Sequence, residues 1–365
     1  MAGLKTKEKQ KVIVAMSGGI DSSVAAALLK KRGFALRQAQ GNLEQCRKVE
    51  VLGVHMKLWK EKKDNIAEKR ARKVAKILGI SFFVLDLQKE FKKRVVECFL
   101  KDLRAGITPN PCIVCNKEIK FGLLLEKALK MKADFIATGH YVQLSRKAQT
   151  YKLLNAKDKE KDQSYFLWRL GQKELKDVLF PIGNYTKNQV RALAKKFNLP
   201  LLSIPESQEI CFIKTAVNNF LKKYLKENPG KIVNANGKIL GKHSGLWFYT
   251  IGQRKGVGLP EGPYYVLNKD PKRNLLIVTR NEKDLYKKEL ICKNINWISG
   301  KTPKLPLKIK AKIRYRHDSA LAIICKPRAK NYKLIFDRPQ KAITPGQSVV
   351  FYNGRELLGG GIICK

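Results

Sequence analysis

A short glycine-containing segment near the start of the chain has the composition of an anion-binding loop. It runs from Ala15 to Ser22 and directly follows the apolar run Val12–Met16. Paired glycines let the backbone approach an anion, and the amides that open the following helix bind negative charge. The spacing is neither that of a Walker A loop nor that of a dinucleotide-binding loop. The sequence therefore predicts a phosphate site after the first strand.

Three of the eight cysteines lie in contexts that suit sulfur chemistry. Cys112 and Cys115 follow two prolines, and Cys211 lies about a hundred residues further along the chain. We expect a helix to begin near Lys117, so that its dipole and the lysine charge favour the thiolate of Cys115. A thiolate is the nucleophile in sulfur transfer. The remaining cysteines are expected to be inert: Cys46, Cys98, Cys292, Cys325 and Cys364.

The elements that position these residues alternate between strands and helices up to about Ile213. That alternation predicts an α/β domain with a doubly wound parallel sheet, over residues 1–213. The expected strands are Val12–Met16, Val51–Met56, Phe82–Leu87 and Phe135–Thr138. The expected helices are Ser22–Lys31, Ile66–Leu78, Phe91–Leu103, Lys117–Met131 and Thr186–Phe197.

Short runs punctuated by glycine replace this pattern after about Lys214. They predict a small all-β central domain over residues 214–284 and a C-terminal β-barrel over residues 285–365. The expected strands of the central domain are Lys231–Val233, Gly245–Tyr249, Tyr264–Leu267 and Leu275–Thr279. Those of the barrel are Lys308–Tyr315, Leu321–Cys325, Lys333–Phe336, Ser348–Tyr352 and Leu357–Ile363.

The charge of the chain points to a polyanionic partner. Its 75 Lys and Arg against 30 Asp and Glu give a net charge of +45, and eleven of these cations fall between Lys301 and Lys333. A basic β surface favours nucleic acid over a membrane, although lysine enrichment of a solvated surface is the alternative. No apolar run approaches the roughly 20 residues of a membrane span, and the lysine-rich start lacks the features of a secretory signal. We expect a cytoplasmic monomer.

The ordered motifs of the chain resemble those of the bacterial tRNA-specific 2-thiouridylases, from about Lys11 to Gly360. The Ser17–Ser22 segment resembles the pyrophosphate loop of the ATP pyrophosphatases. The further matching motifs are Thr108–Gly122, Ala137–Tyr141, Lys161–Phe166, Pro205–Phe212, Tyr249–Leu259, Lys312–Arg316 and Ile343–Gln347.

The resemblance implies a reaction and a role for each matching residue. ATP and Mg²⁺ would convert O2 of the wobble uridine of tRNA(Lys, Glu, Gln) into an adenylate, and a persulfide sulfur would displace AMP. Cys211 would carry that sulfur, received from a cysteine desulfurase or a sulfur-relay protein. Cys115 would then attack the persulfide or close a disulfide with Cys211, while Asp21 would hold Mg²⁺ or orient the phosphates.

The ligand contacts that the resemblance implies fall into three sets. Those to ATP would come from Ala15, Met16, Ser17, Gly18, Gly19, Ile20, Asp21, Ser22, Met56 and Gly139. The target base would lie against Asn110, Pro111 and Cys112. Other contacts to tRNA would come from His140, Lys161, Asp162, Gln163, Arg314, Tyr315 and Gln347, although His140 suits a structural histidine equally well.

The chain departs from the family pattern at three places. Cys112 stands where many members have Asp, Ala35–Glu50 resembles an insertion, and Lys57–Glu68 is shorter and less acidic than usual. The cysteine at position 112 opens an alternative, in which Cys112, Cys115 and Cys211 ligate a [4Fe-4S] cluster. The persulfide relay stays the leading interpretation. Zinc is disfavoured because no fourth ligand has the usual spacing.

Two other classes of function remain as alternatives. Another ATP pyrophosphatase that modifies tRNA or acts as a ligase shares the loop, but a small-molecule ligase needs neither paired cysteines nor a basic β domain. A non-catalytic RNA-binding protein is disfavoured by the intact loop. ATP–pyrophosphate exchange with and without tRNA separates the three.

Overall fold

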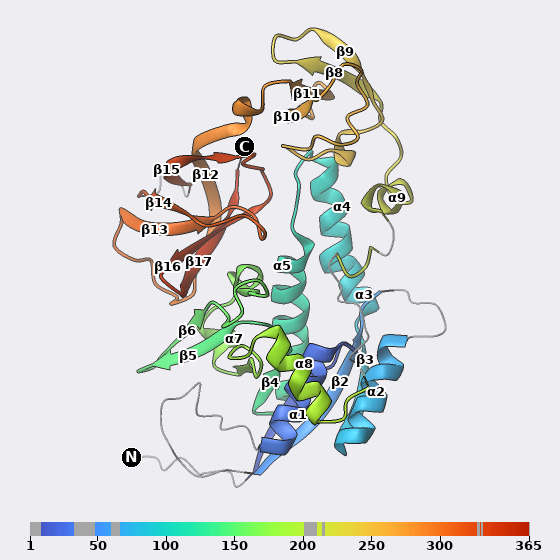
Figure 1. Ribbon diagram of the computed structural model, residues 1–365, viewed down its shortest axis with the longest axis vertical. Helices are drawn as coiled ribbons and strands as arrows, with labels where there is room; N and C mark the ends of the chain where they lie inside the picture. Colours follow the sequence, from blue (N-terminus) through green and yellow to red (C-terminus); the bar gives the residue numbers. More distant parts are fainter. Residues whose placement is uncertain are drawn as a thin grey trace.

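The computed structural model describes residues 9–32, 48–59, 66–200, 210–213, 216–326, 329 and 331–364. Within them, an α/β unit lies at one end of the molecule and a small β unit at the other, and a β-barrel lies beside the segment that joins the two (Figure 1). Cys46 and most of the expected insertion at 35–50 lie outside the described residues. So do residues 60–65 and 201–209, with the start of the motif around Cys211.

A five-stranded parallel sheet of order β3-β2-β1-β4-β7 forms the α/β unit. Successive residues of its first strand point to opposite faces, so that Val12 and Val14 pack in one apolar cluster and Ile13 and Ala15 in another. Both faces are buried, and the predicted doubly wound sheet is confirmed. The strands are β1 Lys9–Ala15, β2 Lys48–Lys57, β3 Ser81–Asp86, β4 Phe135–Ala137 and β7 Val178–Leu179.

Helices cover the two faces of this sheet. One face carries α1 (Ile20–Arg32), α2 (Ile66–Leu78) and α8 (Lys187–Lys196), and the other carries α6 (Leu124–Lys130). Strand order reverses between β1 and β4, and ligands of such sheets bind at the carboxyl ends of the strands there. The other helices are α3 Gln88–Phe91, α4 Glu97–Arg104, α5 Pro111–Cys115, α7 Gln172–Leu175 and α9 Val217–Lys222, with π-helical segments at Lys92–Val96 and Asn116–Leu123.

The small β unit is a four-stranded sheet of order β10-β11-β8-β9. The strand expected at Gly245–Tyr249 was wrong, because Leu246–Phe248 form a 3₁₀ turn that buries Leu246 and Phe248. Periodicity does not distinguish a strand from a helical turn in so short an apolar run. The strands are β8 Gly230–Asn234, β9 Ile239–His243, β10 Tyr265–Asp270 and β11 Leu275–Thr279.

The predicted C-terminal barrel is confirmed. Its strands follow the order β12-β15-β14-β13-β16-β17, and pairing of β17 with β12 closes the ring. A hairpin from the α/β unit, β5 (Gln143–Lys147) and β6 (Thr150–Leu154), extends this sheet by pairing β6 with β17. The barrel strands are β12 Tyr286–Trp297, β13 Leu307–Lys312, β14 Ala320–Ile324, β15 Tyr332–Lys341, β16 Ser348–Asn353 and β17 Glu356–Ile363.

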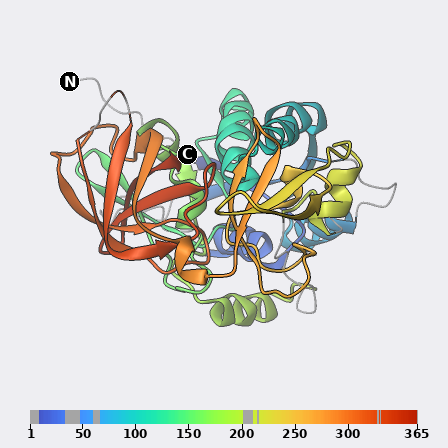
Figure 2. The same ribbon diagram turned by 90° about the horizontal axis from the view of Figure 1, so that it is seen from above.

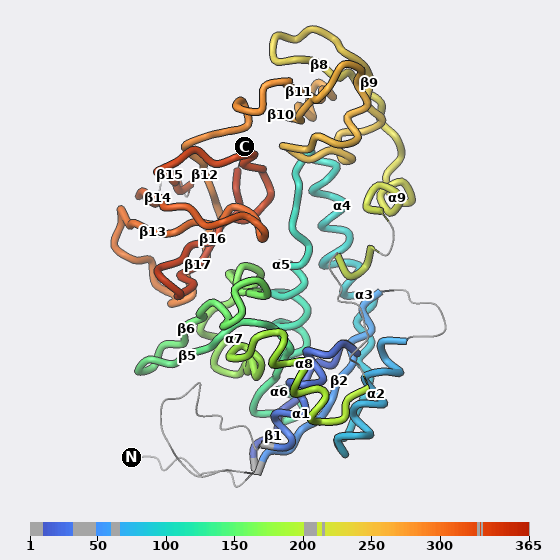
Figure 3. Tube along the Cα trace, viewed as in Figure 1, coloured from blue at the N-terminus to red at the C-terminus, as the bar shows by residue number. Residues whose placement is uncertain are grey.

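The segment between α4 and α5 passes between the two β units. The trace in Figure 3 shows it descending beside the barrel into α5, and Figure 2 shows the barrel and the small β unit side by side. Residues just before Asn110 are therefore placed to touch both units. Within the described ranges, no helix is long and apolar enough to cross a membrane.

Candidate active site

The predicted phosphate loop lies at the carboxyl end of β1. Ser22 holds its turn, because the Ser22 hydroxyl accepts from the amide of Ser17 at 3.1 Å and donates to the carbonyl of Gly19 at 3.1 Å. Gly139, which follows β4, lies so close that a Cβ on it would be 2.6 Å from the amide nitrogen of Ser22. Only glycine permits this approach. The structure thus brings together the Ala15–Ser22 loop and Gly139, which the sequence analysis both assigned to ATP.

The carboxylate of Asp21, in the first turn of α1, is engaged by two other side chains. Lys187 Nζ lies 2.8 Å from Oδ1 and 2.9 Å from Oδ2, and the hydroxyl of Tyr141 donates to Oδ1 at 2.7 Å. The side chain of Lys187 is only 7% exposed, against 30% for that of Asp21. The expected Mg²⁺ ligand is therefore neutralised by a lysine in this conformation.

The helix that carries Cys112 and Cys115 starts earlier than expected. It begins at Pro111, and the side chain of Asn110 caps it by accepting from the amide of Cys112 at 3.2 Å. It then continues through a π-helical segment into α6. Cys115 therefore lies more than a turn inside the helix, where the dipole at the N-terminus has little effect.

The thiolate expected at Cys115 was wrong for this conformation. The residue is buried, and burial raises the pKa of its thiol to about 12, while burial and the nearby Cys211 raise that of Cys112 to about 11. Lys117, the expected cation, is 2.7 Å from Glu174 in an ion pair. The cation whose charge lowers the pKa of both thiols is instead Lys120.

Cys211 lies within electrostatic range of the other two thiols, although it comes from a distant part of the chain. It raises the pKa of both Cys112 and Cys115. The residue is exposed, yet protein atoms crowd its sulfur enough that desolvation raises its own pKa, against the charge of Lys120. All three are free thiols. The structure thus gathers the three predicted cysteines around one lysine.

The loop before Asn110 is held by both β units. Gln347 Nε2, from the barrel, donates to the carbonyls of Thr108 at 2.9 Å and Pro109 at 3.4 Å, and the amide of Thr108 donates to the carbonyl of Pro345 at 3.1 Å. From the small β unit, the buried Lys269 reaches the Thr108 hydroxyl at 3.5 Å. Contacts from outside the α/β unit thus fix where this loop, and the helix after it, begins.

Family models match the chain along most of its length. The tRNA methyl transferase HUP domain matches residues 10–215, its PRC-barrel domain 218–280, and an aminomethyltransferase beta-barrel domain 287–363. The tRNA-specific 2-thiouridylase MnmA of Clostridioides difficile is 42% identical over 98% of both chains. MnmA 1 of Caldanaerobacter subterraneus is 46% identical over 97% of this chain and 98% of that protein.

The chain belongs to the tRNA-specific 2-thiouridylase family. The resemblance drawn from the motifs is thereby confirmed across its full span. Besides the three residues at the target base, the resemblance assigns seven residues of this 2-thiouridylase to tRNA. Most of these seven make contacts within the protein.

Three of the seven, near the carboxyl end of β4, are committed to the protein interior. His140 is buried between Phe121 and Phe180, pairs with the Thr138 hydroxyl at 2.7 Å, and has a pKa held well below its usual value, mainly by burial. The other two are internally hydrogen-bonded: the buried Asp162 accepts from Ala156 and Ser164, and Gln163 accepts from the amide of Tyr141. For His140 and Asp162, burial contradicts direct contact with tRNA in this conformation. Gln163 and Lys161 are both half-buried.

Arg314 and Tyr315 also face the protein rather than an open surface. Arg314 Nη2 donates to the carbonyls of Ile251 and Ala342, each at 2.9 Å, and so joins the small β unit to the barrel. The ring of Tyr315 packs on Phe166 with 4.3 Å between centroids, and Lys312 Nζ lies 5.6 Å from its centroid. The expected phosphate contact and stacking platform are therefore domain-packing residues in this conformation.

Gln347→Ala is expected to slow the reaction about tenfold or more, because misplacing a reacting group by 1 Å costs up to about a hundredfold in rate. The Kd for tRNA is expected to change less than threefold. The variant removes two donations to the loop before Asn110 but leaves the surface charge unchanged. Single-turnover rates and filter-binding titrations measure the two quantities. Gln340→Ala is the matched control, since its Nε2 bonds only to Arg338 of its own strand. A loss confined to tRNA affinity would contradict the positioning role.

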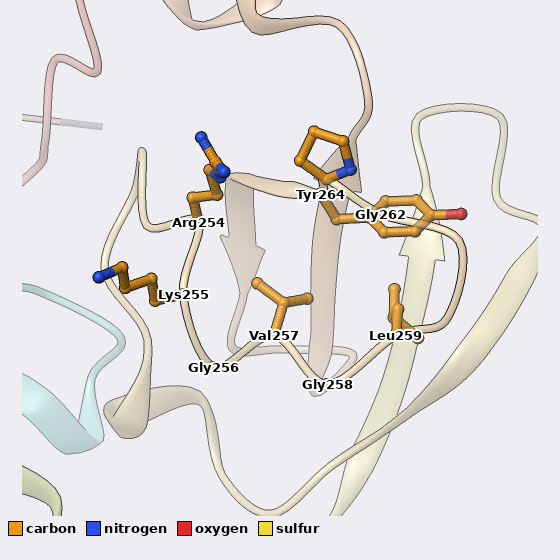
Figure 4. A pocket seen from close by; sticks show the side chains of 9 residues that line it. Arg254, Lys255, Gly256, Val257, Gly258, Leu259, Gly262 and Tyr264 are labelled. Carbon is orange, nitrogen blue, oxygen red and sulfur yellow. The ribbon is translucent and has the colours of Figure 1, made fainter.

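A basic glycine loop of the small β unit borders a cavity of about 460 Å³ that the site predictions missed. Arg254 and Lys255 are exposed at its rim, and Tyr264 forms part of its wall (Figure 4). Gly256 and Gly258 have φ of +78° and +73°, conformations that favour glycine. Exposed cations beside accessible backbone amides suit phosphate oxygens.

Proposed function

We propose that this enzyme 2-thiolates the wobble uridine of tRNA(Lys, Glu, Gln), using ATP. The observation that carries the proposal is that Cys112, Cys115 and Cys211 all lie within electrostatic range of Lys120, with Asn110 capping the helix that carries the first two. Lys120 also acts electrostatically on His140, which directly follows Gly139 at the phosphate loop. The thiols therefore lie at the same end of the fold as the ATP loop.

The chemistry divides into activation and sulfur transfer. O2 of uracil attacks the α-phosphorus of ATP, and pyrophosphate leaves, so that a poor leaving group becomes AMP. The terminal sulfur of a Cys211 persulfide then attacks C2 and displaces AMP, which leaves C2 joined to Cys211 through two sulfurs. Cys115 attacks the Cys211 sulfur, the 2-thiocarbonyl departs, and a Cys115–Cys211 disulfide remains. A dithiol reductant supplies the two electrons and two protons that restore both thiols.

Burial raises the pKa of the three thiols, so Cys115 and Cys211 must lose their protons before they can transfer sulfur. A thiol with a raised pKa is a weak nucleophile at neutral pH. Lys120 is the cation that opposes burial at all three sulfurs. Mg²⁺ is expected to bind with ATP, but the one carboxylate of the loop, Asp21, is paired with Lys187 in this conformation.

An iron–sulfur cluster on the same cysteines does not fit this conformation. In the part of the chain that the structure describes, no three His, Cys, Asp or Glu side chains are arranged to hold a metal ion. We therefore derive no step through a cluster.

The reaction is tested with the purified full chain, unmodified tRNA, ATP, and a cysteine desulfurase with cysteine as the persulfide donor, under a dithiol reductant. The expected products are 2-thiouridine at the wobble position, AMP and pyrophosphate, measured by mass spectrometry of nucleosides and by radiolabelled nucleotide. ATP turnover that is independent of tRNA would favour a ligase, and tRNA binding without turnover would favour a pure RNA-binding protein. An iron assay and visible spectrum after anaerobic purification decide between relay and cluster.

We propose that the partners of the enzyme are tRNA and a persulfide donor, which is either a cysteine desulfurase or a relay protein. We also propose that the enzyme is a monomer in the cytoplasm. Because Arg314 is occupied within the protein, we place the phosphate contacts on exposed cations instead. Arg254 and Lys255 meet that requirement, because both are exposed at the rim of the cavity in the small β unit.

Arg254→Ala/Lys255→Ala is expected to weaken binding to all substrate tRNAs and to lower the slope of log Kd against log salt by about two, because each phosphate that is no longer neutralised reduces the slope by about one. Nitrocellulose filter binding between low and moderate salt measures both quantities. The matched control is Lys73→Ala/Lys76→Ala, which removes the same charge from the exposed side of α2. An equal loss of affinity and slope in both double variants would show that only net charge matters.

A further inference from the structure

The phosphate loop of this enzyme contains no cation of its own. Ala15–Ser22 has one charged residue, the acid Asp21. The triphosphate of ATP is strongly negative, and Walker A loops meet that charge with a lysine inside the motif. Backbone amides and a helix N-terminus supply only part of the compensation. A carboxylate at the start of the helix repels the triphosphate unless a positive charge neutralises that carboxylate.

Lys187 supplies that charge from a distant part of the chain. It is the first residue of α8, 166 positions after Asp21, and its Nζ contacts both carboxylate oxygens. Its backbone amide donates to Asp158 Oδ2 at 2.8 Å, and the capping box of Thr186 and Gln189 fixes the start of the helix. The lysine is therefore held from its backbone, and its ammonium is directed at the loop.

The surroundings of the pair restrict where the ammonium can act. The ring of Tyr141 lies 5.8 Å from Lys187 Nζ, and its hydroxyl bonds the same carboxylate oxygen. The lysine is almost fully buried, whereas a third of the Asp21 side chain is exposed at the mouth of the loop. A buried ion pair is weak evidence for a stabilising role, since apolar pairs of equal volume serve as well. Its place at the loop is better explained by a ligand.

We propose that Lys187 is the cation of the phosphate loop. In the empty enzyme it neutralises Asp21, and when ATP enters its ammonium binds oxygens of the β- and γ-phosphates, the pair that leaves as pyrophosphate. This rests on the proposed use of ATP, but not on the sulfur chemistry. Lys187 is then a direct contact of the leaving group, additional to the residues that the sequence assigned to ATP.

The test measures the binding of ATP, pyrophosphate and AMP to the full chain without tRNA, by isothermal titration. Lys187→Met is expected to weaken ATP and pyrophosphate about tenfold or more, the usual effect of losing a charge-assisted hydrogen bond. AMP lacks the β- and γ-phosphates, so its Kd is expected to change less than threefold. Lys187→Arg, which keeps the charge, is expected to recover part of the loss.

Two controls separate ligand binding from a structural role. Lys152→Met breaks a comparable ion pair, with Glu356 at 2.6 Å, away from the loop, and is expected to bind all three ligands normally. Lys187→Met/Asp21→Asn removes both charges of the buried pair. If the pair is only structural, the double variant regains pyrophosphate affinity and thermal stability together, which would overturn the proposal. Equal losses for AMP and ATP, or unchanged pyrophosphate affinity in Lys187→Met, would overturn it as well.

Discussion

Cys115→Ser and Cys211→Ser are each expected to abolish 2-thiouridine formation, while tRNA-dependent release of pyrophosphate continues. A serine hydroxyl neither carries a persulfide sulfur nor cleaves one, whereas adenylation needs only ATP and the target base. The two thiols lie within electrostatic range of each other, as transfer between them requires. Thiolated tRNA is detected as a retarded band on a gel that contains an organomercurial.

Cys112→Ser and Cys98→Ser complete this series. In the relay, Cys112 only adjoins the target base, so substantial activity is expected to remain with a persulfide donor. If a cluster forms instead, iron content and activity fall together in Cys112→Ser. Cys98, a free and exposed thiol on α4, is the matched control and is expected to be replaceable without loss. Full thiolation by Cys211→Ser would overturn the assignment of the sulfur carrier.

The parallel sheet could be predicted from local sequence because its strands are continuous apolar runs. Helix α2 was also predicted to the residue, since its apolar and charged positions alternate with a clear helical period. The hairpin β5–β6 was missed, because what stabilises it is pairing with β17, with Leu153 opposite Leu357, two hundred residues away. The long strand β12 was missed as well, since few of its residues point into the barrel.

The site divides in the same way between local motif and distant contact. The phosphate loop can be read from adjacent residues, and so can the two prolines and the Asn110 cap before Cys112. The partner of Asp21 is not, because nothing in the sequence around Lys187 distinguishes it from the many other lysines. The burial of His140 and the internal hydrogen bonds of Arg314 could not be predicted for a related reason, because both are properties of the folded chain.

The environment of Cys115 differs from the one that the sequence suggested. Its position after two prolines suggested a helix N-terminus near a lysine. The Asn110 cap places the start of the helix at Pro111, nearly two turns before Lys117, and Glu174 pairs with the charge of Lys117. The residue stays a candidate for sulfur transfer, but the reactive thiolate must be produced during the reaction rather than be present at rest.

Asp21→Ala is expected to abolish thiolation and pyrophosphate release, while the Kd for tRNA stays within threefold of the wild-type value. The carboxylate lies in the phosphate loop and contacts Lys187 and Tyr141, neither of which belongs to the basic β surface. ATP–pyrophosphate exchange and filter binding measure the two properties on the same preparations.

This variant needs a stability control, because it leaves Lys187 buried without its carboxylate. Removing one partner of a buried ion pair costs on the order of 3 kcal/mol, which lowers Tm by several degrees in a domain of this size. Asp21→Asn keeps the shape of the side chain and one acceptor oxygen while removing its charge, and Asp21→Ala/Lys187→Met removes the unpaired lysine. If Asp21 acts on the phosphates, Asp21→Asn is inactive, and Asp21→Ala/Lys187→Met stays less active than Lys187→Met alone although its Tm recovers toward that of the wild type. Activity that returns with Tm would instead make the carboxylate a structural partner of Lys187.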